Sequence, residues 1–86
     1  MALEIKSLVI DGIDYTNDIN TVTFIDTTNY YEYLITLKKF ILTPTSNNPT
    51  YTFQINDTTI TETDEFIYEL ITTMTGTTIR LRKNKG

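Results

Sequence analysis

Threonine constrains this chain more than any other residue, because it occupies nineteen of the 86 positions. Its branched Cβ restricts χ1, which disfavours helix and suits the half-exposed, pleated surface of a sheet. Threonine alternates with larger apolar residues in several segments, including Thr21–Ile25, Tyr51–Ile55 and 77–82. A two-residue period of this kind is typical of strands with one buried face. We therefore expect residues 1–86 to form a single small β-rich domain.

Turn-forming residues divide the first half of the chain into strands. Leu3–Ile10 ends at Asp11-Gly12, a pair typical of tight hairpins, and a short return arm follows it. Thr21–Ile25 is the next expected strand, with Val22 and Phe24 on one face. Tyr30–Leu42 is the longest, and its length together with a switch of its apolar face predicts a bend or a bulge near Lys38-Lys39.

The second half begins with a loop, residues 43–50, that contains two prolines. We expect Tyr30–Leu42 and Tyr51–Ile55 to pair as an antiparallel hairpin with this loop as its tip. Asn56-Asp57 then predicts a tight turn into a strand at Thr58–Thr61, with Ile60 pointing inward.

One segment, from Asp64 to about Met74, has the spacing of an amphipathic helix. Thr63 or Asp64 can cap its start, and Gly76 lies where a left-handed C-cap is expected. Thr77–Arg82 then returns to a period of two.

The expected fold is α+β: a mainly antiparallel sheet, either curled or closed into a small sandwich or barrel, with one C-terminal amphipathic helix followed by a last strand. A β-sandwich or barrel with the helix as a plug is the alternative. In either fold, the apolar face of the helix expected from Asp64 to about Met74 consists of Phe66, Ile67, Leu70, Ile71 and Met74.

Charge is unevenly distributed. Residues 1–79 carry all eleven acids and three lysines, a net charge of −8, whereas residues 80–86 carry four basic residues, a net charge of +4. An acidic body repels polyphosphate on average, so only the short basic C-terminal tail at 80–86 is suited to attract it.

The residues that most often carry catalysis are missing. The chain has no histidine and no cysteine, so it lacks the commonest proton shuttle, a thiolate nucleophile and disulfides. Its three glycines are scattered singly, which excludes the known phosphate-binding loops. The acids Asp11, Asp14 and Asp18 do not match a calcium loop, and Asp11-Gly12 is better explained as a turn. We therefore expect no enzymatic activity, no metal and no cofactor.

The residues best suited to contact a partner are three tyrosines near one strand start and the basic residues of the tail. Tyrosine supplies a large contact area with a hydrogen-bonding tip and is enriched in interface hot spots. The alternative is that the tyrosines cover the margin of the core and that the basic residues are a solvated strand end. The candidate interaction surface comprises Tyr30, Tyr31, Tyr33, Arg80, Arg82, Lys83 and Lys85.

These features favour a non-enzymatic structural or protein-interaction module that assembles through strand edges and the tyrosine-bearing surface. Threonine- and asparagine-rich, cysteine-free small β proteins are frequent among virus and phage particle components, so a small virion protein is the specific form of this hypothesis. A soluble inhibitor or adaptor that docks on a host macromolecule is the first alternative, and a single-stranded nucleic-acid binder is the second. We expect no signal peptide and no membrane-spanning stretch, a virion or cytoplasmic location, and a protein partner, not nucleic acid or membrane.

Overall fold

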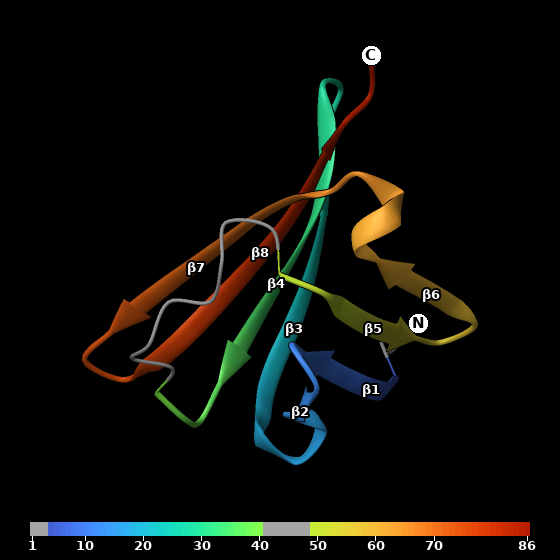
Figure 1. The fold of residues 1–86 in the computed structure, drawn as a ribbon. Helices are drawn as coiled ribbons and strands as arrows, with labels where there is room; N and C mark the ends of the chain where they lie inside the picture. Colours follow the sequence, from blue (N-terminus) through green and yellow to red (C-terminus); the bar gives the residue numbers. More distant parts are fainter. Residues whose placement is uncertain (1–3, 41–48) are drawn as a thin grey trace.

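The computed structural model of the protein describes residues 4–40 and 49–86. Eight antiparallel strands form two four-stranded sheets that face one another (Figure 1). The shorter sheet has the order β2-β1-β5-β6, with β1 at Ile5–Ile10, β2 at Ile13–Asp14, β5 at Tyr51–Ile55 and β6 at Thr58–Thr61. The longer sheet has the order β3-β4-β8-β7, with β3 at Ile19–Asp26, β4 at Tyr30–Leu37, β7 at Ile67–Thr73 and β8 at Gly76–Asn84.

Two single-turn 3₁₀ segments carry the chain between the sheets. The first, η1 at Thr16–Asp18, joins β2 to β3, and the second, η2 at Glu62–Asp64, joins β6 to β7. Each therefore links an edge strand of one sheet to an edge strand of the other. The Thr61 side chain accepts a hydrogen bond from the Thr63 amide, and Asp64 Oδ2 accepts one from the Thr61 amide at 2.8 Å. These bonds fix the turn that leads into the longer sheet.

The core lies between the sheets and follows the two-residue period. Phe53 from the shorter sheet is completely buried and contacts the Tyr33 ring of the longer sheet, with 5.7 Å between ring centroids. Alternate residues of the strands, together with Tyr15 just after β2, supply the rest of the buried apolar set. It consists of Leu8, Ile10, Tyr15, Ile35, Leu37, Tyr51, Ile55, Ile60, Ile79 and Leu81.

The turn predictions for the shorter sheet are confirmed. Asp11 and Gly12 both have positive φ, at 49° and 83°, and join β1 to the short return strand β2. Asn56, at φ 50°, begins the turn between β5 and β6, and Ile60 points into the core. Both turns need left-handed backbone, which glycine, asparagine and aspartate tolerate best.

The expected C-terminal helix is absent, so the α+β assignment was wrong. Residues 67–73 form strand β7, and the described residues contain no α-helix. The helical spacing arose because both faces of β7 carry apolar residues: Tyr68 and Leu70 pack toward the core, whereas Ile67 and Ile71 lie on the outer face. Isoleucine, threonine and tyrosine also favour a strand over a helix.

Gly76 therefore does not cap a helix. It follows the two-residue turn at Met74-Thr75 and begins β8, with φ at 150°. A Cβ at this position would clash with the backbone carbonyl oxygen of Leu37 on the neighbouring strand. Glycine is required because two backbones approach closely here.

The predicted pairing of Tyr30–Leu42 with Tyr51–Ile55 was also wrong. β4 ends at Leu37 and pairs with β3 and β8, whereas β5 lies in the other sheet between β1 and β6. A bend follows β4 at Lys38 and Lys39, as predicted. Residues 41 and 42 and most of the proline-containing loop lie outside the described residues. Strands that follow one another in sequence often pair, but here the chain changes sheets between them.

The basic C-terminal segment is not a tail. Arg80, Arg82 and Lys83 belong to β8, which is hydrogen-bonded to β4 on one side and to β7 on the other. Their side chains alternate between the two faces of the longer sheet, so Arg80 and Arg82 lie on one face and Lys83 lies on the other.

Candidate functional site

The two sheets differ in length, and this leaves one end of the longer sheet uncovered. Strands β3, β4 and β8 have eight or nine residues, whereas β1, β5 and β6 have six, five and four. At about 3.3 Å per residue, a difference of three residues corresponds to about 10 Å. The β3–β4 turn and the end of β8 project beyond the shorter sheet (Figure 1). Among the described residues, no strand of the shorter sheet covers the inner face of this end.

Aromatic rings gather on that uncovered inner face. The Phe24 ring lies 5.0 Å from Tyr33 and 6.1 Å from Tyr31, measured between centroids. Phe66, just before β7, lies 5.8 Å from Tyr31 in an edge-to-face arrangement. Such ring pairs are stabilising beyond the area that they bury. Phe24 nevertheless remains 43% exposed, a large value for a phenylalanine that faces the core side of a sheet.

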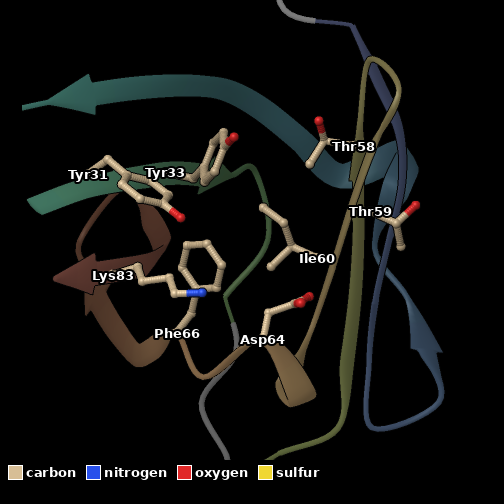
Figure 2. Close-up of a pocket in the computed structure, with 8 residues that line it drawn as sticks. All are labelled: Tyr31, Tyr33, Thr58, Thr59, Ile60, Asp64, Phe66 and Lys83. Carbon is tan, nitrogen blue, oxygen red and sulfur yellow. The ribbon is translucent and has the colours of Figure 1, made fainter. Parts of the chain in front are cut away.

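A hollow of about 210 Å³ opens beside these rings, between the two sheets (Figure 2). Tyr31, Tyr33 and Phe66 form its aromatic wall, and Ile60 adds an apolar side chain from the shorter sheet. The complete lining is Tyr31, Tyr33, Thr58, Thr59, Ile60, Asp64, Phe66 and Lys83. We call Phe24, Tyr31, Tyr33, Phe66 and Lys83 the aromatic end.

Two charged groups border the hollow in different ways. Asp64 is held by its hydrogen bond to the Thr61 amide, so one carboxylate oxygen already has a structural role. Lys83 Nζ lies 5.6 Å from the Phe66 ring centroid, and no carboxylate of the described residues lies within ion-pair distance of it. Burial, with a smaller contribution from Tyr31, raises the pKa of Tyr33 above its ordinary value. Tyr33 therefore stays a neutral hydrogen-bonding group over the physiological range.

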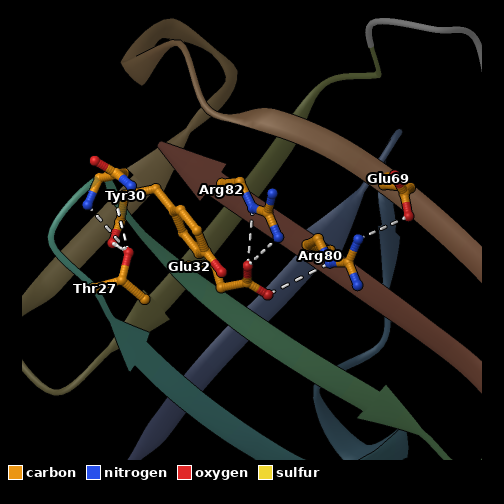
Figure 3. Close-up of polar contacts among 7 residues, drawn as sticks. Thr27, Tyr30, Glu32, Glu69, Arg80 and Arg82 are labelled. Carbon is orange, nitrogen blue, oxygen red and sulfur yellow. Dashed lines mark hydrogen bonds and ion pairs between the residues drawn. The ribbon is translucent and has the colours of Figure 1, made fainter. Parts of the chain in front are cut away.

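The opposite face of the same strands carries an ion-pair network centred on Glu32 (Figure 3). Glu32 is only 2% exposed. Its Oε1 accepts a hydrogen bond from Arg82 Nε at 2.9 Å and lies 2.7 Å from Arg82 Nη2. Its Oε2 lies 3.4 Å from Arg80 Nε, and Arg80 Nη1 donates to Glu69 Oε1 at 3.2 Å. Two arginines therefore neutralise one buried carboxylate.

Aromatic and threonine side chains enclose this network. The Arg82 guanidinium carbon lies 4.1 Å from the Tyr30 ring centroid, a close cation–π contact. Thr27 Oγ1 donates to the Tyr30 carbonyl at 2.9 Å and accepts from the Tyr30 amide at 3.1 Å, which closes the β3–β4 turn beside the ring (Figure 3). We call Tyr30, Glu32, Glu69, Arg80 and Arg82 the charged face.

The sequence-predicted surface is therefore divided in two. Tyr31, Tyr33 and Lys83 come together at the aromatic end, whereas Tyr30, Arg80 and Arg82 lie on the charged face. Lys85 belongs to neither group, because its Nζ forms an ion pair with Asp26 Oδ1 at 2.6 Å. Neighbours in sequence point to opposite faces of a strand, and this alternation separates Tyr30 from Tyr31 and Arg82 from Lys83.

Sequence reasoning missed two members of the aromatic end. Phe24 was correctly placed on one face of its strand, but nothing in the sequence indicated that this face would extend beyond the second sheet. Phe66 was assigned to the helical stripe that proved to be a strand. A comparison of expected strand lengths between the two halves of the chain is the signal that would have pointed to an uncovered end.

The acidic turn considered for calcium has structural hydrogen bonds. Asp11 Oδ1 accepts from the Thr50 amide at 3.0 Å, and Asp14 Oδ1 accepts from the Thr16 amide at 2.9 Å. The bonds from Thr16 hold the pKa of Asp14 below its ordinary value. Within residues 4–40 and 49–86, no three acidic side chains are grouped as a metal site requires, and no helix is long and apolar enough to cross a membrane.

Comparison with protein families, curated proteins and solved structures gives no match to this chain.

Proposed function

We propose that this protein is a non-enzymatic protein-interaction module that docks a protein partner at its aromatic end. The observation that carries the proposal is the open cluster of Phe24, Tyr31, Tyr33 and Phe66 beside a hollow. Aromatic side chains at the centre of a contact patch supply a large share of protein–protein binding energy. A structural component of a larger assembly, such as a virus or phage particle, is the setting that best fits such a module.

The size of the hollow favours a side chain over a metabolite. Pockets for drug-sized ligands usually enclose about 300–1,000 Å³, whereas an apolar cavity of about 150 Å³ holds a benzene-sized group. A hollow of about 210 Å³ is therefore matched to one large side chain from a partner. Threonine hydroxyls, Asp64 and Lys83 at its border can satisfy the polar backbone beside that side chain.

Strand edges offer a second route of attachment to the same partner. β3 and β7 are the outermost strands of the longer sheet, and both begin or end near the aromatic end. An exposed edge can add a strand from another protein through main-chain hydrogen bonds. A partner segment that fills the hollow and continues along β7 would use both features.

Charge pairing weighs against the nucleic-acid alternative. Arg80, Arg82 and Lys85 each have a carboxylate partner, so most of the positive charge of β8 and the residues after it is already neutralised. Binding to phosphate would first require these ion pairs to open. A soluble inhibitor or adaptor would dock with the same aromatic end and would differ only in the partner that it recognises.

Affinity capture from the native source tests the proposal. The protein should retain a protein partner, and Phe24→Ser should abolish this retention because it removes an exposed ring of the aromatic end. Ile13→Ser is the matched control, because Ile13 is 54% exposed in β2, at the opposite edge of the shorter sheet from the strand β6 that lines the hollow. If Phe24→Ser retains every partner of the unmodified protein, or if nucleic acid is retained in place of protein, the proposal is wrong.

A further inference from the structure

Among the described residues, one apolar side chain is far more exposed than any other apolar side chain. Met74 is 97% exposed at the tip of the β7–β8 hairpin. Methionine is flexible and polarisable, and its sulfur makes favourable contacts with aromatic rings. A fully exposed methionine at a protruding turn is therefore well suited to enter an aromatic site.

The hairpin tip holds Met74 in a defined position. The Thr73 side chain accepts a hydrogen bond from the Thr75 amide at 3.3 Å and donates one to the Gly76 carbonyl at 3.3 Å. Gly76 itself is fixed by the close approach of the Leu37 carbonyl. A preorganised turn loses less conformational entropy when its side chain is buried in an interface.

The tip and the hollow lie at opposite ends of the longer sheet. β7 begins at Ile67, directly after Phe66 of the hollow, and reaches the tip seven residues later. Seven residues of strand span about 23 Å. Met74 therefore cannot reach the hollow of its own chain, but it can reach that of a neighbour.

We propose that Met74 of one copy occupies the hollow at the aromatic end of a second copy. The inference rests on the proposed function and names the partner as the protein itself. The hollow has the volume of one large side chain, and its wall of Tyr31, Tyr33 and Phe66 supplies the rings that a thioether prefers. The threonines on both sides of Met74 have no charge that would need desolvation at the rim.

Charges near the two sites are complementary. Lys38 and Lys39 are exposed just after β4, at the end of the sheet where Leu37 pairs with Thr77. Asp57 and Glu65 are exposed and each precedes a lining residue of the hollow, Thr58 and Phe66 respectively. Together with Asp64 of the lining they outnumber Lys83, the one cation among the described residues that line the hollow. A head-to-tail arrangement brings lysines of one copy toward acids of the next and assists association.

The contact is heterologous, because it joins two different surfaces. A bound pair keeps one free tip on one copy and one free hollow on the other, so the contact propagates into a ring or an open filament and does not stop at a symmetric dimer. Such propagation fits a component of a repeating assembly.

Two variants that each remove one half of the contact provide the test. Met74→Ser removes the tip and keeps the hollow, whereas Thr58→Arg blocks the rim at an exposed position and keeps the tip. By sedimentation velocity at high protein concentration, the unmodified protein should form oligomers. Each variant alone should associate at least about tenfold more weakly than the unmodified protein. Mixed together, the two variants should form a one-to-one complex and nothing larger. Ile13→Ser, at a position 54% exposed in the shorter sheet, should associate like the unmodified protein.

Three results would overturn the inference: an unmodified protein that stays monomeric, a Met74→Ser variant that associates fully, or mixed variants that do not complement each other. None of these affects capture of a different protein through Phe24, so the proposed function can stand when this inference fails. Tyr31→Ala, which removes one ring of the hollow wall, serves as a second hollow variant if Thr58→Arg does not fold.

Discussion

The two faces of the longer sheet are built from the same strands but differ in how completely their groups are satisfied. On the charged face, Glu32 has two arginine partners, and Tyr30 covers Arg82. On the inner side of the same strands, the aromatic end leaves Phe24 exposed and Lys83 without a carboxylate partner among the described residues. The closed face contributes to stability, and the open face is available for binding. Substitution of the buried carboxylate on the charged face should therefore destabilise the fold, whereas substitution of exposed residues at the aromatic end should weaken association.

The largest expected effect comes from the ring that supports the aromatic end from below. Phe53→Ala leaves a cavity under Tyr33 in a fully buried position and should lower the free energy of unfolding by about 3–5 kcal/mol. Phe24→Ala removes a ring that is 43% exposed and should cost about 1 kcal/mol. Urea denaturation measures both, and equal losses would show that Phe24 belongs to the core and not to an open surface.

The next effect separates buried from exposed charge. Glu32→Gln leaves two arginines beside an uncharged group and should cost about 3 kcal/mol. Glu69→Gln removes an exposed partner of Arg80 and should change stability by less than about 0.5 kcal/mol. Both variants keep the size of the side chain, so the same denaturation experiment isolates the charge. A Glu32→Gln variant as stable as the unmodified protein would mean that the network contributes little.

A smaller effect is expected at alkaline pH. Burial raises the pKa values of Tyr33 and Tyr51 above the ordinary value of 10.0, so the unfolded chain loses these protons first. Their contribution to stability is fully present below pH 10.0 and is lost as the pH rises toward the higher folded-state pKa values. Tyr33→Phe with Tyr51→Phe should reduce this alkaline loss, as measured by urea denaturation on both sides of the window. If the double variant loses as much stability at alkaline pH as the unmodified protein, the loss comes from other groups.

The smallest effect on stability should come from oxidation of Met74. Its side chain makes little contact with its own chain, so sulfoxide formation should leave the thermal midpoint unchanged. The polar sulfoxide should nevertheless weaken self-association, because it no longer suits an aromatic hollow. Met74→Leu should associate and resist mild peroxide. If the Met74→Leu variant loses association after peroxide treatment, a group other than Met74 is the oxidation-sensitive one.

The strands of the shorter sheet could be predicted from the sequence because their signals are local. Asp11, Gly12 and Asn56 adopt the left-handed backbone that the two turns require, and the alternation around Phe53 and Ile60 identifies the buried face. The segment at 67–73 was misassigned because apolar residues on both faces of a strand reproduce helical spacing over a short stretch. Pairing across sheets depends on contacts distant in sequence, which no local pattern encodes.

The candidate site was predicted in part for the same reason. Tyrosines and basic residues could be singled out as chemically distinctive, and strand alternation places Tyr30 and Tyr31 on opposite faces. The ion pairs of Arg80 and Arg82 with Glu32 could not be foreseen, since fifty residues separate Glu32 from Arg82. The hollow depends on the difference in length between two sheets and becomes visible only when both are built.

The most direct measurement compares two neighbouring positions on opposite faces of β3. A photo-crosslinking phenylalanine analogue at Phe24 faces the aromatic end, and the same analogue at Ile25 faces away from it. In assemblies from the native source, we expect a crosslink to a protein, either another copy or a different chain, from position 24 and none from position 25. Equal crosslinking at both positions, or crosslinking only from position 25, would contradict docking at the aromatic end.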